Sequence, residues 1–386
     1  MCSKDHQHVH CTIIPPDILR NIADSGNAQQ KELAFRAISI SGQMRGRRDA
    51  INNIAIAGAI PTGTKRRTVF DARHLRQLPG VIVRGEGSPA TADVAVNEAY
   101  NGSGKTYDFF KQVFNRNSID DRGMRLNSTV HFDIEYNNAF WNGQQMVYGD
   151  GDGEIFVRFT KSLDVIGHEL AHGITQYEAD LVYEDQPGAL NEHFSDVFGV
   201  LVAQYSKNQT AGQADWLIGK GLFAPGIRGV ALRSMKAPGT AYDDPLIGRD
   251  PQPDHMRRFV NTNSDNGGVH INSGIPNKAF YNLAISLGGR AWERAGRVWY
   301  TTLCNELSSN SSFQECASKT YKVARDLYGA ALASKVRDAW KAVGLNISTP
   351  LQKKPAVKKP PLKADGAKAK TSRAKKPATS QSPAAS

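Results

Sequence analysis

Between about Arg66 and Phe159, β-branched and aromatic residues form short runs that are broken by Gly, Asn and Asp. Such runs are typical of strands joined by turns, and we expect a twisted antiparallel sheet. The strands are predicted within residues 68–72, 80–87, 129–136, 139–153 and 154–159. Residues 92–114 have helical spacing instead, with one face formed by Val94, Ala95, Ala99, Tyr107 and Phe110.

After Lys161 the apolar residues recur every three or four positions, which indicates helices. The predicted helices cover residues 162–179, 189–206, 275–289, 291–307 and 331–344. A further amphipathic helix is expected at 31–44, with its apolar face formed by Leu33, Ala34, Ala37, Ile38 and Met44. A sheet region followed by a helical region predicts an α+β protein with two lobes and a cleft between them.

The composition is that of a soluble globular protein, with 386 residues of which 40% are hydrophobic and 22% charged. No window reaches the roughly 18 apolar residues that a membrane helix requires. The polar, histidine-rich start does not resemble a Sec signal peptide, so we expect a cytoplasmic protein or export by a non-Sec route. Cys2, Cys11, Cys304 and Cys316 are too few for a disulfide scaffold, which favours reduced thiols.

The net charge of +11 is concentrated at the C-terminus. Residues 351–386 hold nine Lys and one Arg against one Asp, a net charge of +9, so the other 350 residues carry only about +2. This tail is rich in Pro and Lys, lacks aromatic residues and is expected to be disordered. It would bind nucleic acid or acidic surfaces non-specifically, or it is a solvated appendage.

The strongest chemical motif is GHELAHG, in which His168 and His172 stand four residues apart. On a helix both imidazoles point the same way and can hold one zinc ion, with Glu169 beside them as a general base for water. Glu192 is the candidate third ligand on the next helix. Asp196, one turn later, could accept the free N–H of a liganding histidine.

These motifs resemble the thermolysin-type metalloproteases over about Arg66 to Gly344, in HELAH, NEHFSD, NNAFWNGQQMVYGDGDG and DNGGVHINSGIPNKAFY. The resemblance implies a β-rich N-terminal lobe and a helical C-terminal lobe, with zinc in the cleft. It implies zinc ligands at His168, His172 and Glu192, and the base at Glu169.

The resemblance also implies groups that handle the substrate. His270 and Tyr183 would donate to the oxyanion of the tetrahedral intermediate, and Asp265 would orient His270.

Asn138 and Ala139 would hold the substrate backbone, and Arg233 would hold the carbonyl after the scissile bond. An apolar pocket for the side chain that follows this bond would be lined by Phe156, Val165 and Leu232. The implied activity is zinc-dependent endopeptidase cleavage of proteins or peptides before bulky apolar residues.

The short N-terminal region and the insertion at 236–255 are similar to the protealysin-like branch, whose precursor carries the Pro-Pro-x-x-Leu element found here as Pro15, Pro16 and Leu19. We therefore expect a zymogen that is inhibited by its own propeptide. The basic stretch with Arg47 and Arg48, which we expect to be exposed, would suit proteolytic cleavage. The expected regions are a propeptide (1–50), a β-rich lobe (66–160), a helical lobe (161–346) and a basic tail (351–386).

Three alternatives concern parts of this interpretation. The chain could be a peptide-binding or inhibitor module on an inactive protease scaffold, although every catalytic position is filled. A thiolate of Cys11 or Cys2, near His6, His8 and His10, could take the open zinc position in the precursor. Alternatively, this N-terminal stretch is exposed to solvent and has no function.

The family's paired calcium site is incomplete in this sequence. Asp164 and Asp215 match its carboxylates, but Ala203, Leu217 and Lys220 stand at the other positions. Because calcium prefers six to eight oxygen ligands, we expect little calcium there. We expect Lys220 to replace its charge by pairing with Asp164 or Asp215.

Overall fold

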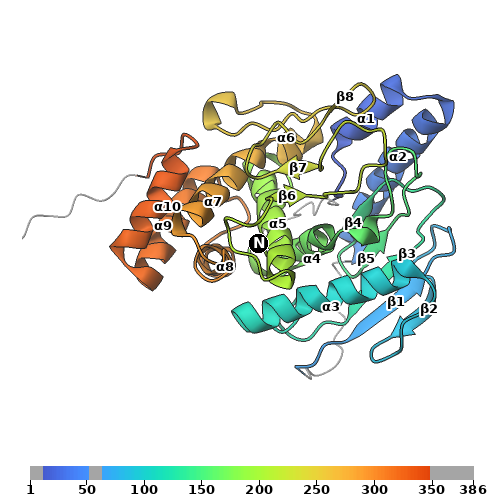
Figure 1. Ribbon diagram of the computed structural model, residues 1–386, viewed down its shortest axis with the longest axis horizontal. Coiled ribbons are helices and arrows are strands. Elements are labelled where there is room, and N and C mark those ends of the chain that lie inside the picture. The colour runs from blue at the N-terminus through green and yellow to red at the C-terminus, as the bar shows by residue number, and fades with distance from the viewer. Residues whose placement is uncertain (1–11, 52–62, 348–386) are drawn as a thin grey trace, which may run out of the picture. The chain divides into compact units, whose positions relative to one another are not determined.

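The computed structural model describes residues 12–51 and 63–347, apart from the side chains of 44–51 (Figure 1). Its first part, which we call the N-terminal segment (residues 12–51), contains α1 (Pro16–Ser25) and α2 (Ala28–Ile51). The helix predicted at 31–44 is the central part of α2, and its residues Leu33, Ala34 and Ala37 are buried. α1 was not predicted. Its start follows from Pro16, because proline suits the first position of a helix.

The sheet has five strands in the order β2-β1-β3-β5-β4. Their bounds are β1 Arg67–Asp71, β2 Val81–Gly85, β3 Leu126–Val130, β4 Ala139–Trp141 and β5 Met146–Tyr148. β1 is parallel to β3 and β3 to β5, so the expected antiparallel sheet is wrong for its three central strands. The long crossover through α3 (Val94–Phe114) returns the chain beside β1 in the same direction.

Two of the predicted strands are wrong over most of their length. β3 ends at Val130, and positive φ angles at His131, Asp133 and Glu135 turn the chain out of the sheet. In residues 154–159, one isolated bridge forms at Phe156 and the 3₁₀ helix η1 (Phe159–Lys161) begins. Here Asp152 Oδ1 accepts the backbone N–H groups of 154–156, so no strand partner is needed.

The predicted helices are confirmed with small shifts in their ends. They are α3, α4 (Leu163–Glu178), α5 (Asp185–Ser206), α7 (Gly274–Leu287), α8 (Ala295–Asn305) and α10 (Ala330–Lys341). Val94, which was predicted on the apolar face of α3, is instead 53% exposed because it stands at the first helical position. α6 (Asp265–Asn272) and α9 (Phe313–Tyr328) were not predicted, although Ser312 and Glu315 form a capping box at the start of α9.

Short elements connect the helices of the C-terminal half. They are β6 (Leu217–Ile218), β7 (Arg233–Ser234), β8 (Asp243–Asp244), β9 (Gly248–Arg249) and η2 (Met256–Arg258). The expected order of a sheet-rich part followed by a helical part is therefore confirmed. Cys304 and Cys316 are free thiols, as predicted.

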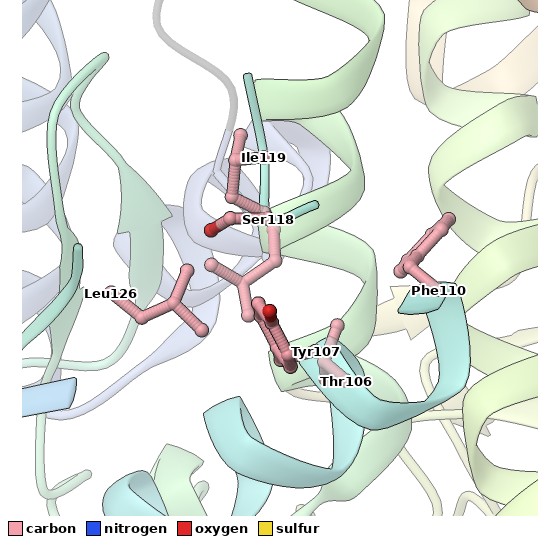
Figure 2. A pocket seen from close by; sticks show the side chains of 7 residues that line it. Thr106, Tyr107, Phe110, Ser118, Ile119 and Leu126 are labelled. Atoms are coloured by element: carbon pink, nitrogen blue, oxygen red, sulfur yellow. The ribbon is translucent and has the colours of Figure 1, made fainter. Parts of the chain in front are cut away.

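A single large apolar cluster joins the sheet, the helices and the N-terminal segment. Trp141, Trp216, Trp299 and Trp340 are fully buried in it. One small pocket lies between α3, the β3 region and α4 and is lined by Tyr107, Leu126 and five other side chains (Figure 2). Its volume of about 10 Å³ is no larger than one water molecule requires, so it is too small to be a substrate site.

No helix in the described part of the chain is long and apolar enough to cross a membrane. The basic tail, Cys2, Cys11 and the three N-terminal histidines lie outside the described residues.

Candidate metal centre

Two helices that pack side by side carry the predicted metal ligands. α4 presents His168 and His172, and α5 presents Glu192. The backbones approach closely at a glycine, because a side-chain carbon at Gly199 would lie 2.4 Å from the backbone oxygen of Asp164. The sequence thus brings residues 20 positions apart to one point inside the protein.

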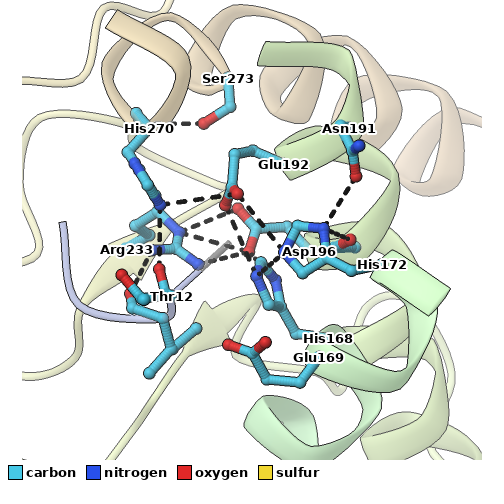
Figure 3. Close-up of polar contacts among 12 residues, drawn as sticks. Thr12, His168, Glu169, His172, Asn191, Glu192, Asp196, Arg233, His270 and Ser273 are labelled. Carbon is cyan, nitrogen blue, oxygen red and sulfur yellow. Dashed lines mark hydrogen bonds and ion pairs between the residues drawn. The ribbon is translucent and has the colours of Figure 1, made fainter. Parts of the chain in front are cut away.

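Both histidines turn Nε2 toward the same point (Figure 3). The two Nε2 atoms are 2.9 Å apart. His172 Nδ1 lies 2.8 Å from Asn191 Oδ1 and 2.9 Å from the Ser195 hydroxyl, and His168 Nδ1 lies 2.8 Å from Asp196 Oδ1. Oxygen acceptors at Nδ1 favour a proton there, which leaves a lone pair on each Nε2. Two facing lone pairs at this distance repel each other unless a cation lies between them.

Glu192 completes the cluster. Its Oε2 is 3.5 Å from His168 Nε2, and its Oε1 is 3.4 Å from His172 Nε2. All three side chains are fully buried, and Glu192 Oε2 has no hydrogen-bond partner among the described residues. Two imidazole nitrogens and one carboxylate are a donor set that suits zinc and leaves one position open.

Asp196 lies behind His168 in a buried ionic network. Arg233 Nη2 and Nε lie 2.8 and 3.0 Å from its carboxylate, and Asn277 Nδ2 donates to it at 2.8 Å. Burial alone would raise the pKa of Asp196, but the charge of Arg233 and the contact with His168 outweigh burial and hold it well below its usual range. Asp196 is therefore ionised and fixes both His168 and Arg233.

Glu169 follows His168 on α4 and is fully buried. Its Oε2 accepts the Trp141 backbone N–H at 3.0 Å, while Oε1 has no hydrogen-bond partner among the described residues. Burial and the nearby charge of Glu192 raise the pKa of Glu169 well above its ordinary value. A carboxyl group in this position can exchange a proton with a water or a leaving group.

A second histidine group faces the cluster from α6. His270 Nδ1 is 2.6 Å from Asp265 Oδ1, and its Nε2 is 3.3 Å from the Tyr183 hydroxyl. Burial would lower the pKa of His270, but the charges of Glu192 and Asp265 raise it to about 9. A protonated His270 is a hydrogen-bond donor at neutral pH. Tyr183 itself donates to Glu192 Oε1.

The start of the N-terminal segment crosses this site as an added strand. Ile13 N donates to Ala139 O at 3.1 Å, Ile14 N donates to Asn138 Oδ1 at 3.0 Å, and Thr12 forms an antiparallel β-bridge with Phe140.

The carbonyl oxygens of Thr12 and Ile13 are also hydrogen-bonded. His270 Nε2 lies 3.0 Å from Thr12 O, and Arg233 Nη1 donates to Ile13 O at 3.2 Å. The backbone around the Thr12–Ile13 peptide bond therefore meets four residues that the sequence assigned to substrate binding or catalysis: Asn138, Ala139, Arg233 and His270. Ile13 and Ile14 are completely buried.

The predicted apolar pocket residues come from three different parts of the chain. Phe156, Val165 and Leu232 are at most 1% exposed and belong to the same apolar cluster as Ile13 and Ile14. Four groups that orient this site through hydrogen bonds were not predicted from the sequence: Asn191, Ser195, Asn277 and the Trp141 amide. For Ser195 the signal was its position one helical turn after Glu192, whereas Asn191, which directly precedes Glu192, and Asn277 and Trp141 carry no such signal.

The region of the incomplete calcium site contains an ion pair. Lys220 Nζ lies 2.9 Å from Asp215 Oδ2. Asp164 accepts instead from the Ser162 hydroxyl and the Gly219 amide, so of the two pairings expected for Lys220 the structure contains the one with Asp215.

Comparison with known proteins adds an independent finding. The family model of the thermolysin metallopeptidase catalytic domain matches residues 65–176, and that of the thermolysin metallopeptidase alpha-helical domain matches residues 179–345. The chain is 51% identical over 342 residues to a protein named extracellular metalloprotease from Pectobacterium carotovorum subsp. carotovorum, covering 87% of this chain and 97% of the relative.

It is also 48% identical over 343 residues to protease PrtS from Photorhabdus sp. (strain Az29), covering 87% and 92% of the two chains. Among solved structures, the precursor of protealysin, a metalloproteinase from Serratia proteamaculans, matches with a TM-score of 0.80 and 51% identity. The match covers 87% of this chain and 99% of that one.

Proposed function

Since the chain belongs to the thermolysin metallopeptidase family and is a metalloendopeptidase, we propose that it is made as a zymogen that holds zinc and cuts before bulky apolar residues. Residues 1–50 are its propeptide, and the lobes at 66–160 and 161–346 form the enzyme. The observation that carries the zymogen proposal is the backbone of Thr12–Ile14, which occupies the groups expected to hold a substrate.

The donor set supports zinc at His168, His172 and Glu192. Two buried imidazoles face each other through Nε2 at 2.9 Å, and a buried carboxylate oxygen of Glu192 lacks a hydrogen-bond partner among the described residues. A metal ion would relieve both features. A zinc ion held there supplies Lewis-acid activation of a water and of the substrate carbonyl.

The chain's own residues supply the proton transfers and the positioning. Glu169 takes a proton from the attacking water through its free Oε1 and passes it to the leaving amine, while the Trp141 amide holds Oε2 in place. His270, oriented by Asp265, donates to the carbonyl oxygen as negative charge develops on it. Tyr183 is the second donor to that oxygen, once its hydroxyl turns from Glu192.

The substrate is held as an added strand. Asn138 and Ala139 bind its backbone, and Arg233, which Asp196 fixes, binds the carbonyl after the scissile bond. In the precursor the Thr12–Ile13 peptide bond lies where the scissile bond of a substrate would lie, so Ile13 is the side chain that follows it. The complete burial of Ile13 supports a preference for bulky apolar residues in a pocket lined by Phe156, Val165 and Leu232.

Two further proposals concern calcium and location. We propose that the Lys220–Asp215 pair replaces a calcium ion, so that metal analysis of the purified chain finds no tightly bound calcium; stoichiometric calcium would contradict this. We also propose that the enzyme acts outside the cell, because a 51% identical relative is named an extracellular metalloprotease. Its basic tail would then contact acidic surfaces or nucleic acid.

The assignment of Glu169 is tested by Glu169→Gln, which keeps the shape of the side chain and removes its basicity. We expect hydrolysis of casein to fall by roughly a hundredfold to ten-thousandfold, while the zinc content stays unchanged. Glu293→Gln, at an exposed glutamate, is the matched control. Casein hydrolysis at the normal rate by Glu169→Gln would remove Glu169 from the mechanism.

A further inference from the structure

Two histidines and an aspartate meet where three parallel strands end. β1, β3 and β5 are neighbours with the same direction, and the chain leaving them carries His74, His131 and Asp150. Backbone hydrogen bonds hold these ends together, including His74 N to His131 O at 2.8 Å. None of the three residues belongs to the centre formed by α4 and α5.

The side chains form a compact cluster. His131 Nδ1 lies 3.0 and 2.9 Å from the two carboxylate oxygens of Asp150, and His74 Nδ1 lies 3.6 Å from Asp150 Oδ2. One ligand atom from each residue falls within 4.8 Å of the others. Both histidines hold positive φ angles, 58° for His74 and 54° for His131, which L-residues adopt rarely.

The far side of His131 is also fixed by a carboxylate. His131 Nε2 lies 2.8 Å from Asp93 Oδ2, and Asp93 is at the same time the N-cap of α3. In metal centres a liganding histidine usually donates its other ring N–H to a carboxylate, which sets its tautomer and orientation. Asp93 would thus leave Nδ1 of His131 as the ligand atom.

We propose that His74, His131 and Asp150 form a second metal site, which takes a transition ion of the Zn²⁺ class with Asp93 orienting His131. Two imidazoles and one carboxylate suit zinc, whereas calcium and magnesium prefer oxygen ligands alone. The His74 side chain is 55% exposed and those of His131 and Asp150 are 20% and 28% exposed, so the ion is reached from solvent and completes its coordination with water.

The role of this ion is structural. It ties the ends of β1, β3 and β5 to one another and, through His131 and Asp93, to the start of α3. This role is independent of the proposed peptidase mechanism, because none of the proposed ligands is a residue assigned to that mechanism.

Equilibrium dialysis of the full chain against micromolar Zn²⁺ tests the proposal, with zinc counted by elemental analysis. The Glu169→Gln background prevents self-digestion. We expect the parent to bind one zinc per chain more than His74→Ala and Asp150→Asn, and zinc to raise the Tm of the parent more than that of these variants. His255→Ala is the matched histidine control and should bind as the parent does.

The half-exposed His74 can be truncated without disturbing the core, and circular dichroism would verify that the variant is folded. Zinc bound by the N-terminal histidines or by the α4–α5 centre is common to all variants and cancels in the comparison. Equal zinc content and equal Tm shifts in the parent and His74→Ala would overturn the proposal, leaving a protonated His131 between two aspartates.

Discussion

At the scale of single residues, Asp196 links the proposed zinc ligand His168 to Arg233, which holds the backbone of the N-terminal segment. All three side chains are buried. Removing either Asp196 or Arg233 would therefore leave an uncompensated charge inside the protein. In the proposed mechanism one carboxylate would thus couple metal binding to substrate binding.

Asp196→Asn should therefore change two measurements together. Loss of the negative charge leaves Arg233 buried without a counter-charge, which lowers the free energy of unfolding by about 3 kcal/mol in urea titrations. The weaker hold on His168 should lower zinc affinity by roughly tenfold to a hundredfold in competition with a chelator. Asp215→Asn, which breaks an exposed pair with Lys220, should change the unfolding free energy by less than about 1 kcal/mol. Equal effects of the two variants would contradict the role of Asp196.

Asp17 belongs to the N-terminal segment, and its negative charge at neutral pH disfavours docking of this segment on the rest of the protein. Its Oδ1 is buried and has no hydrogen-bond partner among the described residues. Burial, and next the charge of Asp265, raise its pKa from 3.8 to about 6, although the charge of His270 opposes them; Asp250 and Tyr242 also face it. Because the docked segment binds the proton more tightly, docking weakens as the pH rises from about 4 to about 6.

Asp17→Asn should remove this penalty. On the Glu169→Gln background at pH 7, we expect trypsin to cleave the N-terminal segment roughly tenfold more slowly than in the parent, because a neutral side chain needs no desolvation of charge. Asp24→Asn, at an exposed position of the same helix, is the control. Faster or unchanged cleavage of Asp17→Asn would show that the charge of Asp17 does not weaken docking of the segment.

At the scale of elements, the geometry of the centre depends on how closely α4 and α5 pack. A methyl group at Gly199 would lie 2.4 Å from Asp164 O and 3.2 Å from His168 Cβ. The two helices would have to move apart, and Glu192 would move with α5 relative to the two histidines of α4.

Gly199→Ala is therefore expected to lower the free energy of unfolding by about 1–3 kcal/mol and to weaken zinc binding. Gly212→Ala is the matched control, because nothing lies within 4 Å of the added methyl group there. Chemical denaturation and zinc competition would be measured on both variants. Zinc binding that is unchanged in Gly199→Ala would mean that the helix spacing does not set the geometry of the centre.

The elements also show what the sequence could predict. α4 and α5 were predictable because apolar residues recur at helical spacing along their sequences, and the spacing of four residues put His168 and His172 on one side of α4. Both helices are in fact buried on all sides over their central turns. The parallel direction of β1 and β3 was not predictable, because it depends on the path of the chain between them. The strand formed by Thr12 on Phe140 joins residues more than 120 positions apart, and no local pattern carries such a pairing.

At the scale of the whole molecule, the N-terminal segment is integrated with the enzyme. Its apolar residues join the single large cluster, and polar contacts spread over several loops, among them Asn21 to Ile247 and Arg36 to Asp133. Its first residues lie at the proposed catalytic groups, so substrate and the docked segment cannot occupy these groups together. Activity should therefore require removal or displacement of the segment.

Inhibition by the N-terminal segment is best tested by following the purified chain over time with intact-mass spectrometry and casein hydrolysis on the same samples. We expect the 386-residue chain to be inactive, and casein hydrolysis to rise in proportion to the species that has lost about its first 50 residues. The full-length chain hydrolysing casein at the rate of the shortened one would contradict this expectation.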